Sequence, residues 1–122
     1  MPVGIDQQKT RAELMKVLSR FPEVSLSVME AHSYDPSWCD PDGEMLRIIQ
    51  HNAHAITGIT PQPVVTLAGT DCRYWRQRGI PAYVYGASPG NMGTKDEGVA
   101  IKEFLDVVRT HVSSAYDYPM RT

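Results

Sequence analysis

The stretch that most constrains this chain is residues 69–97, which reads GTDCRYWRQRGIPAYVYGASPGNMGTKDE. Its first three residues are a glycine, a threonine and an aspartate, and the last two of these carry short side-chain oxygens. Residues of this kind cap helix N-termini, where backbone N–H groups lack partners. The pattern therefore predicts a helix over residues 72–78 that ends at Gly79.

Beyond that helix, the stretch predicts one strand and one long loop. Residues 80–85 are rich in β-branched and aromatic side chains and predict a strand with Pro81 near its start. Residues 86–98 contain four glycines and a proline, without the apolar periodicity of a helix or a strand. A loop of this length in a compact domain is usually functional or disordered, which directs the search for function to this region.

Three more helices are predicted from apolar residues at helical spacing. Asp6 is placed to cap a helix over residues 7–21. Asp42 is placed to cap a helix over residues 43–57, which ends before a glycine. Residues 99–115 carry the clearest helical pattern in the chain. On the inner face of the helix over residues 43–57 we expect Met45, Ile48, Ile49, Asn52, Ala53 and Ile56.

Strands are predicted between these helices. Residues 24–29 alternate apolar and polar side chains, residues 63–68 form a short apolar run, and residues 1–5 resemble the end of another strand. Residues 33–43 hold three aspartates, two prolines and a glycine, and are the best candidate linker. This alternation predicts an α/β or mixed α+β fold in which helices cover a mostly parallel sheet.

Composition excludes several classes of protein. With 122 residues, the chain fits one ordinary domain. A net charge of −2 and dispersed basic residues give no argument for binding nucleic acid or an anionic membrane. No apolar run approaches a membrane span, and the N-terminus lacks the layout of a signal peptide. Two cysteines, Cys39 and Cys72, are too few for a disulfide framework, so we expect a cytoplasmic protein.

Several side chains invite a chemical interpretation. His51 and His54 lie three residues apart on a predicted helix, which allows a metal pair, but no acidic or cysteine ligand accompanies them at helical spacing. The aspartates of residues 33–43 lack the spacing of a calcium-binding loop, so they indicate a turn. Cys72 fits a small buried residue better than a nucleophile, because no histidine is close in sequence.

The order of motifs resembles the C-terminal portion of one family of zinc metallohydrolases, which includes acetylornithine deacetylase, succinyl-diaminopimelate desuccinylase and glutamate carboxypeptidase. That portion has a GTD-x-R segment, a GIPAV-x-G strand and a DE-containing loop before a last helix. The present chain has GTDCR, GIPAYVYG and the pair Asp96 and Glu97. Upstream, the PVGID opening and the segment through Met29 resemble the closing half of the family's inserted dimerisation domain. The resemblance covers nearly all of the chain.

The resemblance implies two partial domains. Residues 1–32 would be part of a dimerisation (lid) unit, and residues 33–122 would be the C-terminal part of the catalytic domain. Most of the family's zinc or cobalt ligands lie upstream of the matching segment. The last ligand, a histidine, corresponds here to Gly93, which has no side chain to coordinate a metal. We therefore expect no catalytic residue and no metal ligand in this chain alone.

The resemblance also implies a place for substrate. Gly69, Thr70, Asp71 and Arg73 correspond to the loop and helix start that face the family's active-site cleft. A helix N-terminus beside a guanidinium suits a carboxylate. Alternatively, Thr70 or Asp71 only caps the helix and Arg73 is a solvated surface charge. The expected ligand is a small carboxylate or an N-acyl amino acid, and a homo-oligomer is expected because partial domains leave sheet edges and apolar faces uncovered.

Two functions from different classes remain open. The first is a fragment or truncated relative of a metal-dependent amidohydrolase or peptidase that is inactive on its own. The second is a non-catalytic anion-binding or protein-interaction domain, whose glycine-rich loop over residues 86–93 holds an anion through backbone amides. The glycine spacing of that loop matches neither the Walker A loop nor G-x-G-x-x-G.

Overall fold

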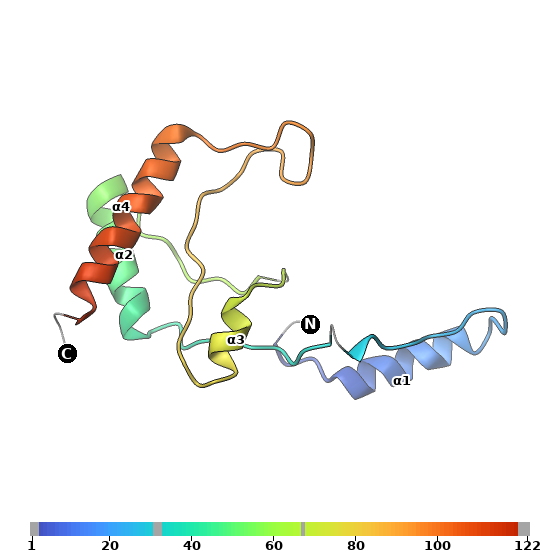
Figure 1. Ribbon diagram of the computed structural model, residues 1–122. Helices are drawn as coiled ribbons and strands as arrows, with labels where there is room; N and C mark the ends of the chain where they lie inside the picture. The colour runs from blue at the N-terminus through green and yellow to red at the C-terminus, as the bar shows by residue number, and fades with distance from the viewer. Residues whose placement is uncertain (1–2, 31–32, 67, 120–122) are drawn as a thin grey trace. The chain divides into compact units, whose positions relative to one another are not determined.

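The computed structural model describes residues 3–30, 33–66 and 68–119, and four helices lie within them (Figure 1). They are α1 (Gln7–Leu18), α2 (Glu44–Thr57), α3 (Cys72–Arg76) and α4 (Ile101–Asp117). The chain divides into two compact units. The first unit comprises Met1–Trp38 and Val65–Gly69 and contains α1, whereas the second comprises Cys39–Val64 and Thr70–Thr122 and contains the other three helices.

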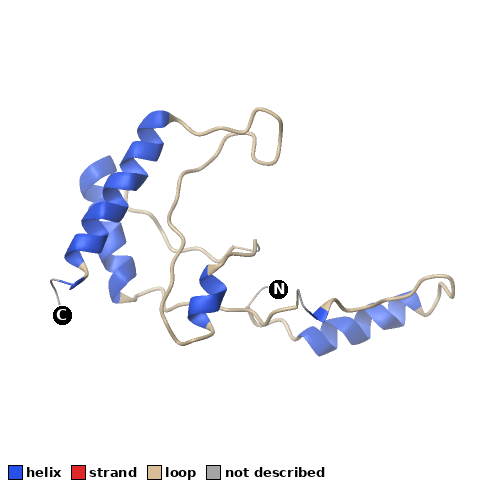
Figure 2. Cartoon of the chain, viewed as in Figure 1, coloured by secondary structure: helices blue, strands red, loops and turns tan. Residues whose placement is uncertain are grey.

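The predicted α/β fold is wrong. Figure 2 shows helices joined by loops, and no strand occurs in the described part of the chain. The one backbone bridge among these residues joins Gly90 to Gly98. Residues 3–5, 24–29, 63–66 and 80–85, where strands were expected, are irregular. The remaining parts of those predicted strands, residues 1–2 and 67, lie outside the described residues.

The strand predictions failed for a physical reason. Alternation of apolar and polar side chains indicates that one face of a segment suits burial, but a sheet also needs a neighbouring backbone to complete its hydrogen-bond ladder. In residues 80–85, side chains bind the backbone groups that a neighbouring strand would otherwise bind. The Ala82 N–H donates to Cys39 Sγ at 3.2 Å, and Arg76 Nε donates to the Ala82 carbonyl at 2.8 Å. Side-chain hydrogen bonds thus bind this segment without making it a strand.

All four predicted helices are present, with ends that shift by a few residues. Asp6 caps α1 as expected, because its Oδ1 accepts the Lys9 N–H at 3.0 Å. The prediction that Asp42 caps α2 is wrong, since Gly43 occupies the N-cap position without a side-chain bond. Gly58 ends α2 as expected, in a left-handed conformation with φ of 76°.

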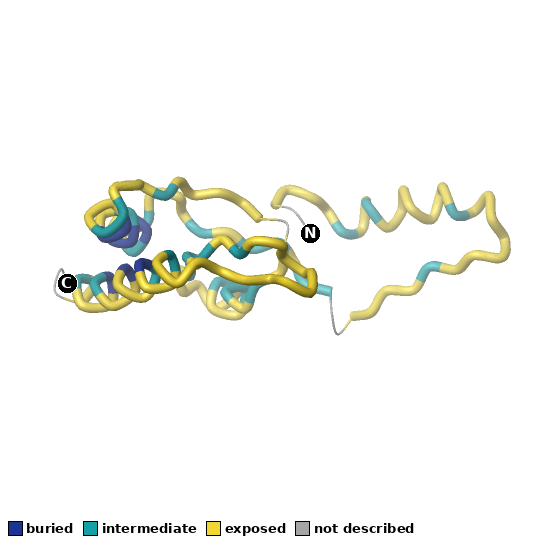
Figure 3. The backbone as a smooth tube through the Cα atoms, turned by 90° about the horizontal axis from the view of Figure 1, so that it is seen from above, coloured by how far each residue is buried: buried dark blue, intermediate teal, exposed yellow. Residues whose placement is uncertain are grey.

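The core of the second unit lies where α2 packs against α4 (Figure 3). Helix α2 contributes the apolar part of this core, and α4 contributes polar side chains. The buried residues are Leu46, Ile48, Ile49, Asn52 and Ala53 of α2 and Asp106, Thr110 and Ser114 of α4. Among the residues expected on the inner face of α2, Met45 and Ile56 are only half-buried, and Leu46 was not predicted. No residue of α1 is buried.

Candidate functional site

The four residues predicted to bind substrate are placed around the start of α3. Gly69 belongs to the first unit and is exposed. Thr70, Asp71 and Arg73 belong to the second unit and are consecutive around the first turn of the helix. Thr70 is half-buried, and its Oγ1 accepts the Cys72 N–H at 3.3 Å. Asp71 occupies the N-cap position, is exposed and makes no side-chain capping bond. Of the two candidate caps, Thr70 therefore performs the capping.

Arg73 is the cationic residue of this group, and its side chain contacts Tyr74. Its guanidinium carbon lies 4.6 Å from the centre of the Tyr74 ring, a distance typical of a cation–π contact. One guanidinium nitrogen also donates to the Tyr74 hydroxyl at 2.9 Å. The Tyr74 carbonyl in turn accepts from Arg78 at 3.0 Å. These contacts hold a half-buried positive charge in one orientation on α3.

A second cluster binds α3 to residues 82–83. Cys72 Sγ donates to the Tyr83 carbonyl at 3.7 Å, and Cys39 Sγ donates to the Ala82 carbonyl at 3.4 Å. The Tyr83 hydroxyl donates to the Asp40 carbonyl at 2.7 Å. Burial raises the pKa of the Tyr83 phenol above 10.0, and the nearby Cys39 and Asp40 act in the same direction. Both thiols bind backbone oxygens, and Cys72, which was predicted to be a small buried residue, is half-buried.

Sequence reasoning missed this cluster. Cys39 and Ala82 lie 43 residues apart, as do Asp40 and Tyr83. No local pattern connects residues at that separation. In the sequence, residues 39–40 and residues 82–83 share only a polar side chain with a proline nearby. This combination is too common to predict a contact.

Candidate metal ligands do not gather in the described residues. His51 and His54 are both exposed, and His54 Nδ1 lies 3.1 Å from Thr60 Oγ1. His111 Nε2 lies 2.9 Å from the Tyr85 carbonyl. Among residues 3–30, 33–66 and 68–119, no group of three or more histidine, cysteine, aspartate or glutamate side chains is arranged to hold a metal ion.

The position of the family's last metal ligand lies in a self-contained loop. Gly90 and Gly98 exchange two backbone hydrogen bonds, of 2.8 and 3.3 Å, which close residues 91–97 into a loop. Gly93 has φ of 77°, a conformation that L-amino-acid side chains rarely adopt. Its N–H donates to Glu97 Oε2 at 2.9 Å. A histidine at this position would be strained, and Glu97 is used to stabilise the loop.

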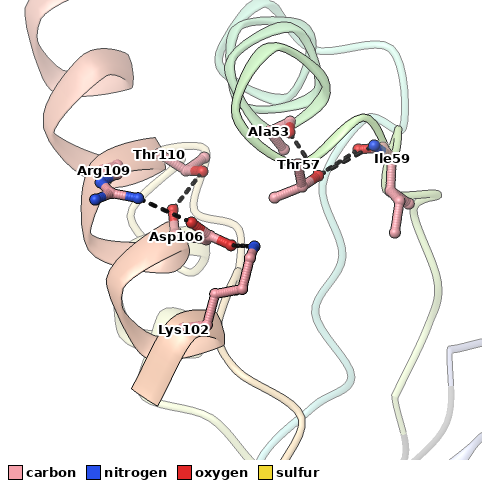
Figure 4. Close-up of polar contacts among 7 residues, drawn as sticks. All are labelled: Ala53, Thr57, Ile59, Lys102, Asp106, Arg109 and Thr110. Atoms are coloured by element: carbon pink, nitrogen blue, oxygen red, sulfur yellow. Dashed lines mark hydrogen bonds and ion pairs between the residues drawn. The ribbon is translucent and has the colours of Figure 1, made fainter. Parts of the chain in front are cut away.

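The buried carboxylate of Asp106 is bound by two cations of its own helix (Figure 4). Lys102 and Arg109 both form ion pairs with it, the latter at 3.2 Å. The hydrogen bond from Lys102, helped by the charges of both cations, lowers the pKa of Asp106 below 3.8. The Thr110 hydroxyl donates to the Asp106 carbonyl at 2.9 Å. A carboxylate held ionised by two cations is a poor general acid or base at neutral pH, so we assign it a structural role.

Comparisons with protein-family models, with curated proteins and with solved structures find no match to this chain. Among the described residues, no helix has the length and apolar character needed to cross a membrane. The functional interpretation therefore depends on the residues themselves and on the motifs of residues 69–97.

Proposed function

We propose that this chain is part of a metal-dependent amidohydrolase or peptidase, and that α3 binds the carboxylate end of an N-acyl amino acid or peptide. The observation that carries the proposal is the half-buried side chain of Arg73, which contacts the Tyr74 ring and follows Thr70 and Asp71 in sequence. The GTDCR motif that supplies Thr70, Asp71 and Arg73 belongs to the run over residues 69–97 that resembles the metallohydrolase family.

The chemistry of Arg73 supports a carboxylate ligand. A guanidinium carries five N–H donors in one plane. One Arg73 nitrogen donates to the Tyr74 hydroxyl, and stacking on the Tyr74 ring does not itself occupy a donor. Two parallel N–H groups match the two oxygens of a carboxylate. Because Tyr74 already restricts the side chain, binding costs less conformational entropy than it would for a solvated arginine. The anion contact is assigned to the side chain and not to the helix terminus, since α3 has only five residues.

In this proposal the chain does not carry the hydrolytic centre. The family position for the last metal ligand is Gly93, and its backbone conformation disfavours a side chain. Zinc or cobalt, held by residues of other segments of the enzyme, would polarise the scissile carbonyl and lower the pKa of a bridging water. The contribution of the present chain is to bind and orient the carboxylate side of the substrate.

A second function is a non-catalytic interaction domain. The observation that favours it is the position of the apolar side chains of α4. Five of them, Ile101, Phe104, Leu105, Val108 and Val112, are exposed, whereas polar residues of the same helix are buried. An exposed apolar surface on a soluble domain marks an interaction site. The two functions are compatible, because they use different helices of the second unit.

The experiment is a titration of the ¹⁵N-labelled chain, followed by NMR, with an N-acetylated amino acid and with the corresponding N-acetyl amino acid amide. We expect the free carboxylate to shift the α3 resonances and the neutral amide to have little effect. Arg73→Gln should weaken carboxylate binding by about tenfold or more, because a hydrogen-bonded ionic contact contributes roughly 1.5–3 kcal/mol.

Arg11→Gln, an exposed position on α1, is the matched control, because it removes the same charge from the chain at a distance in sequence from α3. This variant should bind the carboxylate like the unmodified chain. Equal binding of the acid and the amide, or unchanged affinity in Arg73→Gln, would contradict the proposal.

A further inference from the structure

Helix α4 has two opposite faces of different character. The side chains that α4 buries against α2 are those of Asp106, Thr110 and Ser114, spaced four residues apart. An α-helix turns by about 100° per residue, so the centre of the opposite face lies along Ile101, Leu105, Val108 and Val112. These four residues and Phe104 define the α4 stripe, and all five are exposed. The helix therefore packs through its polar face and presents its apolar face to solvent.

A third side of α4 is already occupied by the chain itself. The Ser88 N–H donates to Glu103 Oε1 at 2.7 Å, and His111 Nε2 lies 2.9 Å from the Tyr85 carbonyl. The rings of Tyr85 and His111 also meet edge to face, with centroids 5.8 Å apart. Residues 85–88 thus cover the flank of α4 between Glu103 and His111. The α4 stripe lies on the side that neither α2 nor this segment covers.

We propose that the α4 stripe is a dimer interface, in which α4 of one chain packs antiparallel against α4 of a second copy. The stripe has self-complementary spacing. In an antiparallel pair related by a two-fold axis near residues 106–107, Ile101 opposes the partner copy's Val112, and Leu105 opposes the partner copy's Val108. Phe104 lies beside the axis in both copies. The α4 stripe of one copy can therefore cover the α4 stripe of the other, with their aliphatic residues opposite one another.

The exposed area is sufficient for such a dimer. Exposure along the stripe ranges from 42% at Val108 to 79% at Ile101, and Tyr116 at its edge is 70% exposed. An aromatic side chain buries about 150–250 Å², so Phe104 and Tyr116 offer roughly 250 Å² per chain, and the aliphatic residues add at least as much. Two copies would remove about 1,000 Å² or more from water, which reaches the size of a specific interface.

The charges beside the stripe oppose the pairing only in part. Lys102 and Arg109 border it, and a two-fold axis brings these flanks of two copies near each other. Both cations are ion-paired to Asp106 of their own helix. The single Asp106 carboxylate offsets one of the two positive charges before the second copy binds, which lowers the repulsion between the two flanks. The antiparallel arrangement also places opposite ends of the two helix dipoles together.

Sedimentation velocity of the full chain over a range of micromolar concentrations tests the proposal. We expect a reversible monomer–dimer equilibrium. Val108→Glu should raise the dimer dissociation constant by about 100-fold or more, because two-fold symmetry places each new charge in the interface twice. The substitution is compatible with the helix, since glutamate has the higher helix propensity, and far-UV circular dichroism should show unchanged helix content.

Ile59→Glu is the matched control, because Ile59 is 71% exposed and lies outside the stripe. This variant should dimerise like the unmodified chain. A monomer at all concentrations, or association that Ile59→Glu weakens as much as Val108→Glu does, would overturn the proposal.

Disulfide trapping tests the antiparallel register. With Cys39 and Cys72 replaced by serine, Leu105→Cys and Val108→Cys chains are mixed and oxidised. The antiparallel pairing predicts mixed disulfides between the two variants, since residues 105 and 108 of different copies face each other. If only disulfides between identical variants form, the register is wrong. Both readouts leave Arg73 unchanged, so failure here is distinguishable from failure of carboxylate binding by α3.

Discussion

Asn52, Asp106, Thr110 and Ser114 are polar residues buried where α2 meets α4, and each has hydrogen-bonding partners. The Asn52 side-chain amide donates to Ser114 Oγ at 3.3 Å and to Asp117 Oδ2 at 3.0 Å. A buried polar group without a partner typically costs about 1–3 kcal/mol, whereas a paired one is tolerated. This pairing explains how α4 can bury its polar face while its apolar face remains exposed.

Asp106 should make the stability of the fold depend on pH in the acid range. Its pKa is lowered in the folded chain, chiefly by the hydrogen bond from Lys102. A carboxyl group with a depressed folded-state pKa stabilises the fold above its unfolded pKa and loses that contribution as pH falls through the folded value. We therefore expect Asp106→Asn to lower the thermal midpoint at neutral pH. The difference from the unmodified chain should shrink as the pH falls below 3.8.

Asp71→Asn is the control, since Asp71 is exposed and makes no side-chain capping bond. Thermal unfolding, followed by circular dichroism across the acid range, should show little effect of this substitution. If the difference in thermal midpoint between Asp106→Asn and the unmodified chain grew as the pH fell, the role assigned to Asp106 would be refuted.

Helix α2 holds the apolar part of the core, and Ile48 is its largest fully buried side chain. Ile48→Ala removes three buried carbon atoms and leaves a cavity, which typically costs about 2–4 kcal/mol. Ile59→Ala removes the same atoms from a side chain that is 71% exposed and should change stability by less than about 0.5 kcal/mol. Urea denaturation followed by helical circular dichroism measures both. Equal losses would show that the α2–α4 contact is not the stabilising core.

Local signals predicted the helices well. Asp6 and Gly58 mark the ends of α1 and α2, where a side-chain cap and a left-handed residue act within a few positions. The same kind of signal gave a wrong prediction at Asp42. The N–H of Asp42 donates to Asp40 Oδ1, and Gly43 is the N-cap residue of the helix. In α4 the apolar spacing correctly predicted a helix. It did not indicate which face is buried, because Asp106 and Thr110 find their partners within α4 and Ser114 is bonded by Asn52 of α2.

The second unit contains the proposed carboxylate-binding site on α3 and the proposed dimer interface on α4, and its described residues hold no group of three or more side chains suited to a metal. We expect the purified chain, supplied with zinc or cobalt, to show no hydrolysis of N-acetylated amino acids above background. Gly93→His should not restore activity, because φ of 77° disfavours the side chain and a single ligand cannot hold a catalytic metal.

A family deacylase assayed in parallel is the positive control for the substrate and the metal. Turnover by the 122-residue chain that a chelator abolishes would contradict this prediction. Such a result would require ligands brought together in a way that differs from the described arrangement.

The helices, the Asp6 cap of α1, the Gly58 end of α2 and the motif that suggests a metallohydrolase could be predicted from the sequence, because each depends on residues close to one another in the chain. Tertiary structure decided the rest. Cys39 meets Ala82, Tyr83 meets Asp40 and Asn52 meets Ser114 across 43, 43 and 62 residues. Strands depend on pairing at such distances, and here the segments expected to form them gain side-chain contacts instead. The face of α4 that is buried was likewise decided by tertiary structure, since burying a polar group costs little only when it has a hydrogen-bonding partner, as Asn52 is for Ser114.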